Sequence, residues 1–187
     1  IERTFKVLMV NVEDSENDLW RRLFSFAKHN PKIVEKQDLL EKNLFVYAGR
    51  GKMGPLMTLN DGNPVPSEHA TELENMIEVL RPDLVILDTK SRLYGLNEDS
   101  NDHAAQWVSL LETISHKYAC GLMILHHVSK ARATNSSQLA SRGASSLIDN
   151  ARFAILLTPP SSEEAKKYSI KNPGEYFAMQ TVKSNYA

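Results

Sequence analysis

The chain has 187 residues, of which 42% are hydrophobic and 24% charged, and its formal net charge is −1. This length and apolar content fit one globular domain with a substantial core, and the near-neutral charge excludes a global basic field for nucleic acid. The single cysteine, Cys120, excludes an internal disulfide, and no apolar run approaches the roughly 18 residues that span a membrane. We therefore expect a cytoplasmic protein without a membrane segment.

Aliphatic runs alternate with amphipathic stretches from the start of the chain to about residue 125. Strands are predicted over residues 7–12, 44–48, 84–87 and 122–125, and all but the second have the composition of buried parallel strands. Helices are predicted where apolar residues recur at helical spacing, over residues 16–28, 67–80 and 101–118. The alternation predicts an α/β fold with a mostly parallel sheet flanked by helices.

The segment 49–66 is rich in glycine and proline and is predicted to be a loop. Within it, the run Gly49-Arg50-Gly51-Lys52-Met53-Gly54 is similar in composition to a phosphate-binding loop. The spacing GxxxxGK[ST] is absent, and Pro55 obstructs the helix that should follow. We therefore reject this run as a phosphate-binding loop.

The C-terminal part of the chain begins with a loop of different composition. Residues 128–142 are small, polar or basic, which indicates a mobile basic loop. Two further strands, 152–157 and 176–182, are separated by a short helix, 162–168, and by the turn Asn172-Pro173-Gly174. These strands predict an antiparallel addition to a single domain that covers residues 1–187.

Two acids follow aliphatic runs, and in an open α/β sheet the ligand site lies beyond the carboxyl ends of the strands. Glu13 follows the first run, where a carboxylate can orient and deprotonate an attacking water; helix capping by Asp14 or Ser15 is the structural alternative. Asp88 follows four aliphatic residues, as the acid of a Walker B strand does, and such an acid binds Mg²⁺. Thr89, beside it, is a further candidate for cofactor binding.

Basic and imidazole side chains supply the other candidates. His126 and His127 end the third aliphatic run, where one imidazole can contact a nucleotide phosphate, although a structural pair is the alternative. Arg152 begins the predicted strand 152–157 and suits either an arginine finger or a surface ion pair. The basic loop suits contact with a phosphate backbone, or it is simply solvated; its candidate DNA-binding cations are Lys130, Arg132 and Arg142.

The order of these motifs resembles that of the plasmid-encoded hexameric replicative helicases, which are RecA-like ATPases. The matching runs cover nearly the whole chain: Glu13-Asp14, Leu87-Asp88, His126-His127-Val128-Ser129-Lys130, Ser141-Arg142-Gly143-Ala144-Ser145, Asp149-Asn150-Ala151-Arg152 and Lys183-Ser184-Asn185-Tyr186. The resemblance implies a homohexameric ring that hydrolyses ATP with Mg²⁺ at subunit interfaces and moves along single-stranded DNA.

By matching position, the resemblance implies one role for each candidate. Glu13 is the catalytic base, Asp88 the Walker B acid and metal ligand, and His126 the sensor of the γ-phosphate. Arg152 is the finger that reaches a neighbour's nucleotide, and Lys183 approaches the same interface.

The main departure of the sequence from this family is that the Gly-rich loop and its lysine, which should precede the strand 7–12, do not occur. We therefore expect a RecA-like domain truncated at its N terminus, which alone is not a competent ATPase. A RecA-like ATPase of recombination or regulation is one alternative. A nonenzymatic oligomeric module that binds DNA is another.

Overall fold

The part of the chain that the structure describes divides into two compact units. The computed structural model describes residues 4–127 and 145–185. Unit 1 consists of Ile1–Asn97 and Ser109–His127, and unit 2 consists of Glu98–Val108 and Val128–Ala187. The single domain over residues 1–187 stays a prediction.

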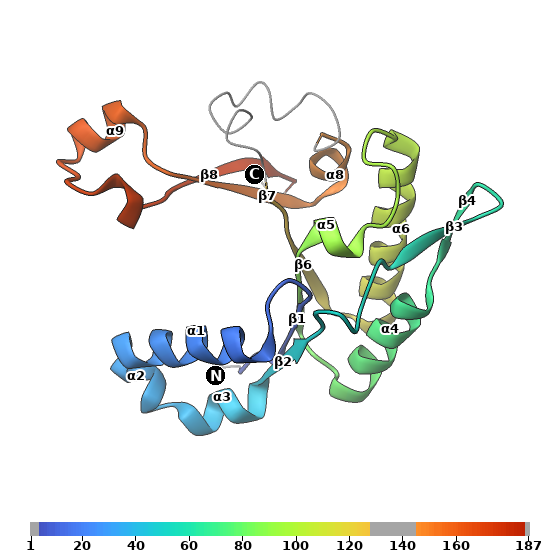
Figure 1. The fold of residues 1–187 in the computed structure, drawn as a ribbon, viewed down its shortest axis with the longest axis horizontal. Helices are drawn as coiled ribbons and strands as arrows, with labels where there is room; N and C mark the ends of the chain where they lie inside the picture. The colour runs from blue at the N-terminus through green and yellow to red at the C-terminus, as the bar shows by residue number, and fades with distance from the viewer. Residues whose placement is uncertain (1–3, 128–144, 186–187) are drawn as a thin grey trace. The chain divides into compact units, whose positions relative to one another are not determined.

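Strands and helices alternate in unit 1, as the hydrophobic pattern predicts (Figure 1). In chain order the elements are β1 (Val7–Asn11), α1 (Glu16–His29), α2 (Pro31–Val34), α3 (Gln37–Asn43), β2 (Leu44–Ala48), β3 (Met57–Asn60), β4 (Asn63–Pro66), α4 (Glu68–Leu80), β5 (Leu84–Asp88), α5 (Lys90–Leu93), α6 (Asn101–Tyr118), which continues from unit 2, and β6 (Gly121–Leu125). Each predicted strand and helix of this region is confirmed within a few residues.

The main sheet has four strands in the order β2-β1-β5-β6, and every neighbouring pair is parallel. This arrangement confirms the predicted α/β class. The carboxyl ends of the strands form one row, in which Asn11 lies opposite both Ala48 and Asp88, and Asp88 lies opposite Leu125. Polar residues at these ends are therefore neighbours in space.

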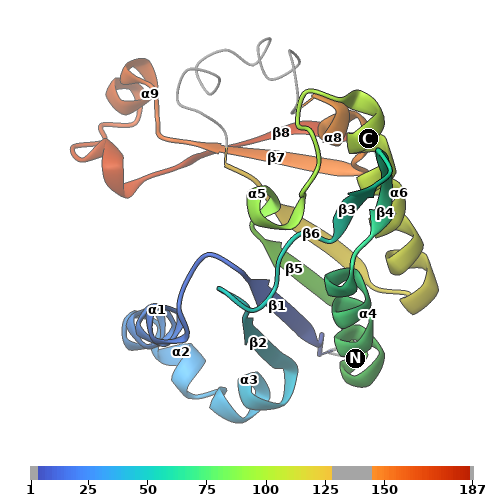
Figure 2. The same ribbon diagram turned by 45° about the vertical axis from the view of Figure 1, so that its right-hand side comes forward.

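Helices cover both sides of this sheet, with α1 on one side and α4 on the other (Figures 1 and 2). Burial alternates along the two central strands: Leu8 and Val10 of β1 and Val85 and Leu87 of β5 are at most 1% exposed. The prediction of a buried strand at 122–125 is wrong, because Leu122 and Ile124 of β6 are only half-buried and its other residues are exposed. Met123 and Leu125 are 46% and 39% exposed, because β6 is an edge strand whose second face is left uncovered by the described residues.

Capping residues set the ends of the helices that flank the sheet. The Ser15 side chain accepts a hydrogen bond from the backbone N–H of Asp18 at the start of α1, and Ser67 does the same for His69 at the start of α4. Helix α4 ends where Arg81 takes a left-handed conformation, with φ of 50°, directly before Pro82.

The prediction of a loop throughout 49–66 is wrong for its second half. Strands β3 and β4 form an antiparallel hairpin there, joined by Asp61 and Gly62, both with positive φ. An Asp-Gly pair between short strands is the preferred sequence of a tight two-residue hairpin turn. The proline content of the segment concealed this signal, since Pro64 and Pro66 lie inside β4.

Unit 2 contains a second antiparallel pair. Its further elements are α8 (Ser145–Asn150), β7 (Phe153–Thr158), α9 (Ser162–Lys167), the 3₁₀ helix η1 (Pro173–Glu175) and β8 (Ala178–Ser184). Strands β7 and β8 pair antiparallel, which confirms the predicted addition, although β7 begins one residue after Arg152. Among the described residues, no helix is both long and apolar enough to cross a membrane.

Candidate functional site

The side chains of Asn11 and Asp88 meet at the carboxyl edge of the sheet. Parallel pairing of β1 and β5 places the two residues opposite each other, and Asn11 Nδ2 donates to Asp88 Oδ2 over 2.6 Å. The backbone also joins the two strands here, because the N–H of Val12 donates to the carbonyl of Asp88 over 2.7 Å. Asn11 is completely buried. Asn11 is not among the site residues predicted from the sequence.

The turn after β1 carries two acids with different surroundings. The N–H groups of Glu13 and Asp14 both donate to Asn11 Oδ1, over 3.1 and 2.7 Å. Asp14 also pairs with both terminal nitrogens of Arg22 on α1, over 2.8 and 2.9 Å. Arg22 therefore balances the charge of Asp14. The helix cap is Ser15 rather than Asp14, which settles the capping alternative in favour of the serine.

Asp88 lies in an environment that opposes its charge. Burial raises the pKa of its carboxyl group, and the nearby negative charges of Glu13 and Asp14 raise it further. The hydrogen bond from Asn11 and the proximity of His127 act in the opposite direction but do not outweigh these causes. A carboxylate in this position is stabilised by a cation.

The imidazole that reaches Glu13 is that of His127. Its Nε2 lies 3.2 Å from Glu13 Oε2, although β1 and β6 are separated in the sheet by β5. His127 is thus brought to the predicted catalytic base, whereas the predicted role of His126 as a phosphate sensor stays a prediction. Adjacent residues of an extended chain point to opposite sides, so the sequence alone does not show which of the two histidines turns towards Glu13.

Thr89 has a structural contact at this edge. Its side chain is fully buried, and its hydroxyl donates to the backbone carbonyl of Leu125 over 3.0 Å. This bond joins the ends of β5 and β6. The peptide bond between Asp88 and Thr89 is cis. The predicted contact of Thr89 with a cofactor stays a prediction.

The residues at this edge are suited to bind Mg²⁺. Asp88 Oδ2 accepts from Asn11, while Asp88 Oδ1 accepts no hydrogen bond from any residue that the structure describes. Carboxylate oxygen is the ligand that Mg²⁺ prefers. No group of three or more His, Cys, Asp or Glu residues able to hold a metal occurs within 4–127 and 145–185. A Mg²⁺ ion here would therefore take most of its ligands from water and phosphate, as is usual for this ion.

The remaining predicted residues lie in unit 2 or outside the described residues. In unit 2, the backbone carbonyl of Arg152 accepts from the N–H of Asn185 over 3.0 Å, and Lys183 Nζ donates to the backbone carbonyl of Asp149 at the end of α8. Arg152 and Lys183 therefore flank the same end of the β7–β8 pair. The predicted mobile loop 128–142 lies outside the described residues, with its candidate cations Lys130, Arg132 and Arg142.

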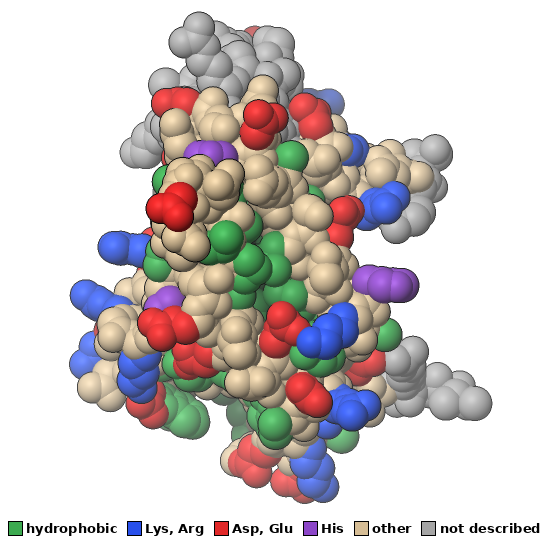
Figure 3. Space-filling model, turned by 90° about the vertical axis from the view of Figure 1, so that its right-hand side faces the viewer, with side chains coloured by type: hydrophobic (Ala, Val, Ile, Leu, Met, Phe, Trp, Pro, Cys, Tyr) green, Lys and Arg blue, Asp and Glu red, His purple; other side chains and the backbone are tan. Residues whose placement is uncertain are grey.

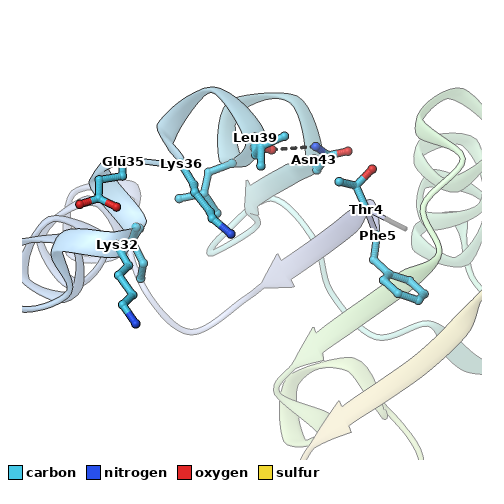
Figure 4. A pocket seen from close by; sticks show the side chains of 9 residues that line it. Thr4, Phe5, Lys32, Glu35, Lys36, Leu39 and Asn43 are labelled. Carbon is cyan, nitrogen blue, oxygen red and sulfur yellow. Dashed lines mark hydrogen bonds between the residues drawn. The ribbon is translucent and has the colours of Figure 1, made fainter. Parts of the chain in front are cut away.

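Unit 1 contains a pocket of about 490 Å³, and Figure 4 shows the side chains that line it. Thr4 and Phe5, which precede β1, line it on one side, and residues of α2 and α3 line it on the other. It thus lies at the amino end of β1, whereas Glu13 and Asp14 follow its carboxyl end. Ligand sites of parallel sheets occur at the carboxyl end, so this pocket is not the candidate site.

The chain was also compared with models of known protein families. A family model described as "AAA domain" matches residues 2–133, which is more than half of the chain. The matched range contains Asn11, Glu13, Asp88 and both histidines.

Proposed function

This chain belongs to the AAA domain family of P-loop ATPases, and we propose that it serves a DNA-dependent motor of the replicative-helicase type. ATP bound with Mg²⁺ is the proposed substrate, single-stranded DNA the proposed track, and a homohexameric ring the proposed assembly. The observation that carries the proposal is that parallel pairing of β1 and β5 brings Glu13 and Asp88 to the same carboxyl edge of the sheet, with His127 against Glu13.

Each group at this edge has a distinct task in the proposed hydrolysis. Asp88 is the residue that would hold Mg²⁺, and the bound ion supplies neutralisation of phosphate charge. Glu13 orients the attacking water and takes its proton as the water oxygen bonds to the γ-phosphorus and ADP leaves. His127 contacts Glu13 and fixes the position of its carboxylate. Asp14 takes no part in this hydrolysis, because its carboxylate is paired with Arg22 and accepts a hydrogen bond from Asn11.

The ring and the DNA contact extend the proposal to the rest of the chain. Arg152 is proposed as the finger that stabilises charge on a neighbour's nucleotide, with Lys183 beside it. The cations of residues 128–142 are proposed to neutralise DNA phosphates. The 187 residues contain no GxxxxGK[ST] motif, so hydrolysis is measured on the full protein in its native assembly.

The test compares ATP hydrolysis by the wild type, Glu13→Gln and Glu16→Gln, with and without single-stranded DNA. Glu16 is an exposed acid in the first turn of α1 and is the matched control. We expect DNA to stimulate the wild type and Glu16→Gln equally. Glu13→Gln should lower kcat by about 10²-fold to 10⁴-fold with little change in KM for ATP, because a general base acts on the transition state.

Three outcomes would contradict the proposal in different ways. A wild-type rate for Glu13→Gln would remove the assigned base. Hydrolysis that ignores DNA would favour a RecA-like ATPase of recombination or regulation. No hydrolysis by the wild type under any condition, together with DNA binding, would favour the nonenzymatic module.

A further inference from the structure

One buried amide connects the Asp88 carboxylate to the turn that carries Glu13. Asn11 Nδ2 donates to Asp88 on β5 and, over 3.3 Å, to Asp14 Oδ2, while Asn11 Oδ1 accepts from the backbone N–H groups of Glu13 and Asp14. Two donated and two accepted hydrogen bonds are the full capacity of an asparagine amide. A completely buried side chain with all four satisfied is held in one orientation.

The neighbours of Asn11 also determine which atom of the amide faces which side. Two backbone N–H groups point at one atom, which must be an acceptor and is therefore the oxygen. The nitrogen then faces Asp88 and Asp14, which are both acceptors. An aspartate at this position retains the acceptor for the turn but places a carboxylate against Asp88. A smaller apolar residue loses both sets of contacts.

We infer that Asn11 is a positioning residue of the nucleotide site, which holds the Asp88 carboxylate and the backbone of Glu13 in one fixed arrangement. The inference rests on the proposed function, in which Asp88 holds the cation and Glu13 takes the proton. Asn11 directs Asp88 Oδ2 towards β1 and leaves Oδ1 for the ligand. The same amide fixes the turn from which the Glu13 side chain starts. A shift of about 1 Å in either acid is enough to cost roughly 100-fold in rate.

Two substitutions separate the contacts of Asn11, and one control matches the charge change. Asn11→Asp retains acceptance from the turn and loses donation to Asp88, whereas Asn11→Ala loses both. Asn63→Asp, in the exposed part of the β3–β4 hairpin, adds the same negative charge away from the site. All variants are made in the full protein, and kcat and KM for ATP are measured below the unfolding temperature of each.

Amide hydrogen exchange supplies a measurement that does not depend on hydrolysis. The N–H groups of Glu13 and Asp14 should be protected in the wild type and in Asn11→Asp. In Asn11→Ala they should exchange at least about 10-fold faster, because the acceptor is gone. Unprotected amides in the wild type would overturn the inference even if neither variant folds.

The kinetic result expected is a fall in kcat of about 10-fold to 100-fold for Asn11→Asp, with KM for ATP within about 2-fold of the wild type. Asn63→Asp should keep the wild-type kcat. A purely structural role would lower the unfolding temperature of the Asn11 variants and leave kcat unchanged, which would overturn the inference.

Glu13→Gln, measured in parallel, distinguishes a failure of the Asn11 inference from a failure of the proposed function. An inactive Glu13→Gln beside a fully active, folded Asn11→Asp would remove Asn11 alone as a positioning residue. A fully active Glu13→Gln would remove the proposed function, and the inference with it.

Discussion

The acids on helix α4 and the acids at the carboxyl edge of the sheet have opposite surroundings. On α4, Glu72 accepts from the Tyr47 hydroxyl over 2.7 Å, and Glu74 pairs with Lys117 Nζ over 2.5 Å and accepts from the Tyr118 hydroxyl. On the side of the molecule that includes α4, acidic and basic side chains lie next to one another in the lower part of the view (Figure 3). The negative charges of Glu72 and Glu74 are therefore stabilised by hydrogen-bond donors.

The sheet edge is crowded instead with carboxylates. Lys117 lowers the pKa of Glu74, whereas burial and the neighbouring acids Glu13 and Asp14 raise the pKa of Asp88. Both residues are carboxylic acids of the same unit, so the direction of the shift reports the surroundings and not the residue type. An acid that the fold stabilises serves the fold, while an acid that the fold destabilises indicates a site for a ligand that supplies the missing charge.

The largest expected effect is on turnover. Asp88→Asn in the full protein should lower ATP hydrolysis by roughly 100-fold or more, because an amide is a poor substitute for the carboxylate that holds Mg²⁺. Glu74→Gln removes a carboxylate of the other kind and should leave the rate within about 2-fold of the wild type. A rate that falls equally in both variants would show that the two acid sets do not differ in function.

The next effect is on stability, and its sign should differ between the two sets. At pH 7 Asp88→Asn removes a carboxylate that the fold disfavours, so the unfolding temperature should rise. Glu74→Gln should lower the unfolding temperature only slightly, because the Lys117 side chain is 57% exposed and such pairs contribute little. Thermal unfolding followed by circular dichroism measures both.

The higher stability expected of Asp88→Asn should depend on pH, because the pKa of Asp88 is shifted upwards in the folded protein. Since the pKa is raised in the folded state, the cost of the charged form is present at neutral pH and disappears as the pH falls through the raised value. The gap between Asp88→Asn and the wild type should therefore narrow as the pH is lowered from 7 towards 4. A gap that widens would mean that the carboxylate stabilises the fold.

The sequence alone predicted the sheet and its two acids, because strand composition and chain direction determine them. Aliphatic runs of four to six residues mark parallel strands, and a polar residue directly after such a run lies at the ligand edge. Glu13 and Asp88 were found in this way. The Asp-Gly pair of the β3–β4 hairpin also indicates a tight turn in the sequence, but the surrounding prolines favoured the prediction of a loop.

The roles of Asn11 and His127 were not predictable, because they depend on pairing register. In the sequence Asn11 is simply a polar residue near the end of an aliphatic run. Only the register of β1 against β5, which places Asn11 opposite Asp88, shows its contact. A one-residue slip would turn it to the other face of the sheet. His127 reaches Glu13 across an intervening strand, and local spacing carries no information on the path of the chain beyond β6.

The smallest effect concerns the hydrogen bond from Tyr47 to Glu72. Donation to this carboxylate raises the pKa of Tyr47 to about 12 from 10.0, so its contribution to stability is present below pH 10 and is lost as the pH rises through about 12. Tyr47→Phe should lower the free energy of unfolding by about 0.5 kcal/mol at pH 9, as the loss of one hydrogen bond does. The difference from the wild type should vanish towards pH 12, measured by urea unfolding. Tyr168→Phe, at a side chain that is 65% exposed, is the control for removing a phenol. A difference that stays constant with pH would show that Tyr47 does not compensate Glu72, and the contrast between the two acid sets would then rest on Glu74 alone.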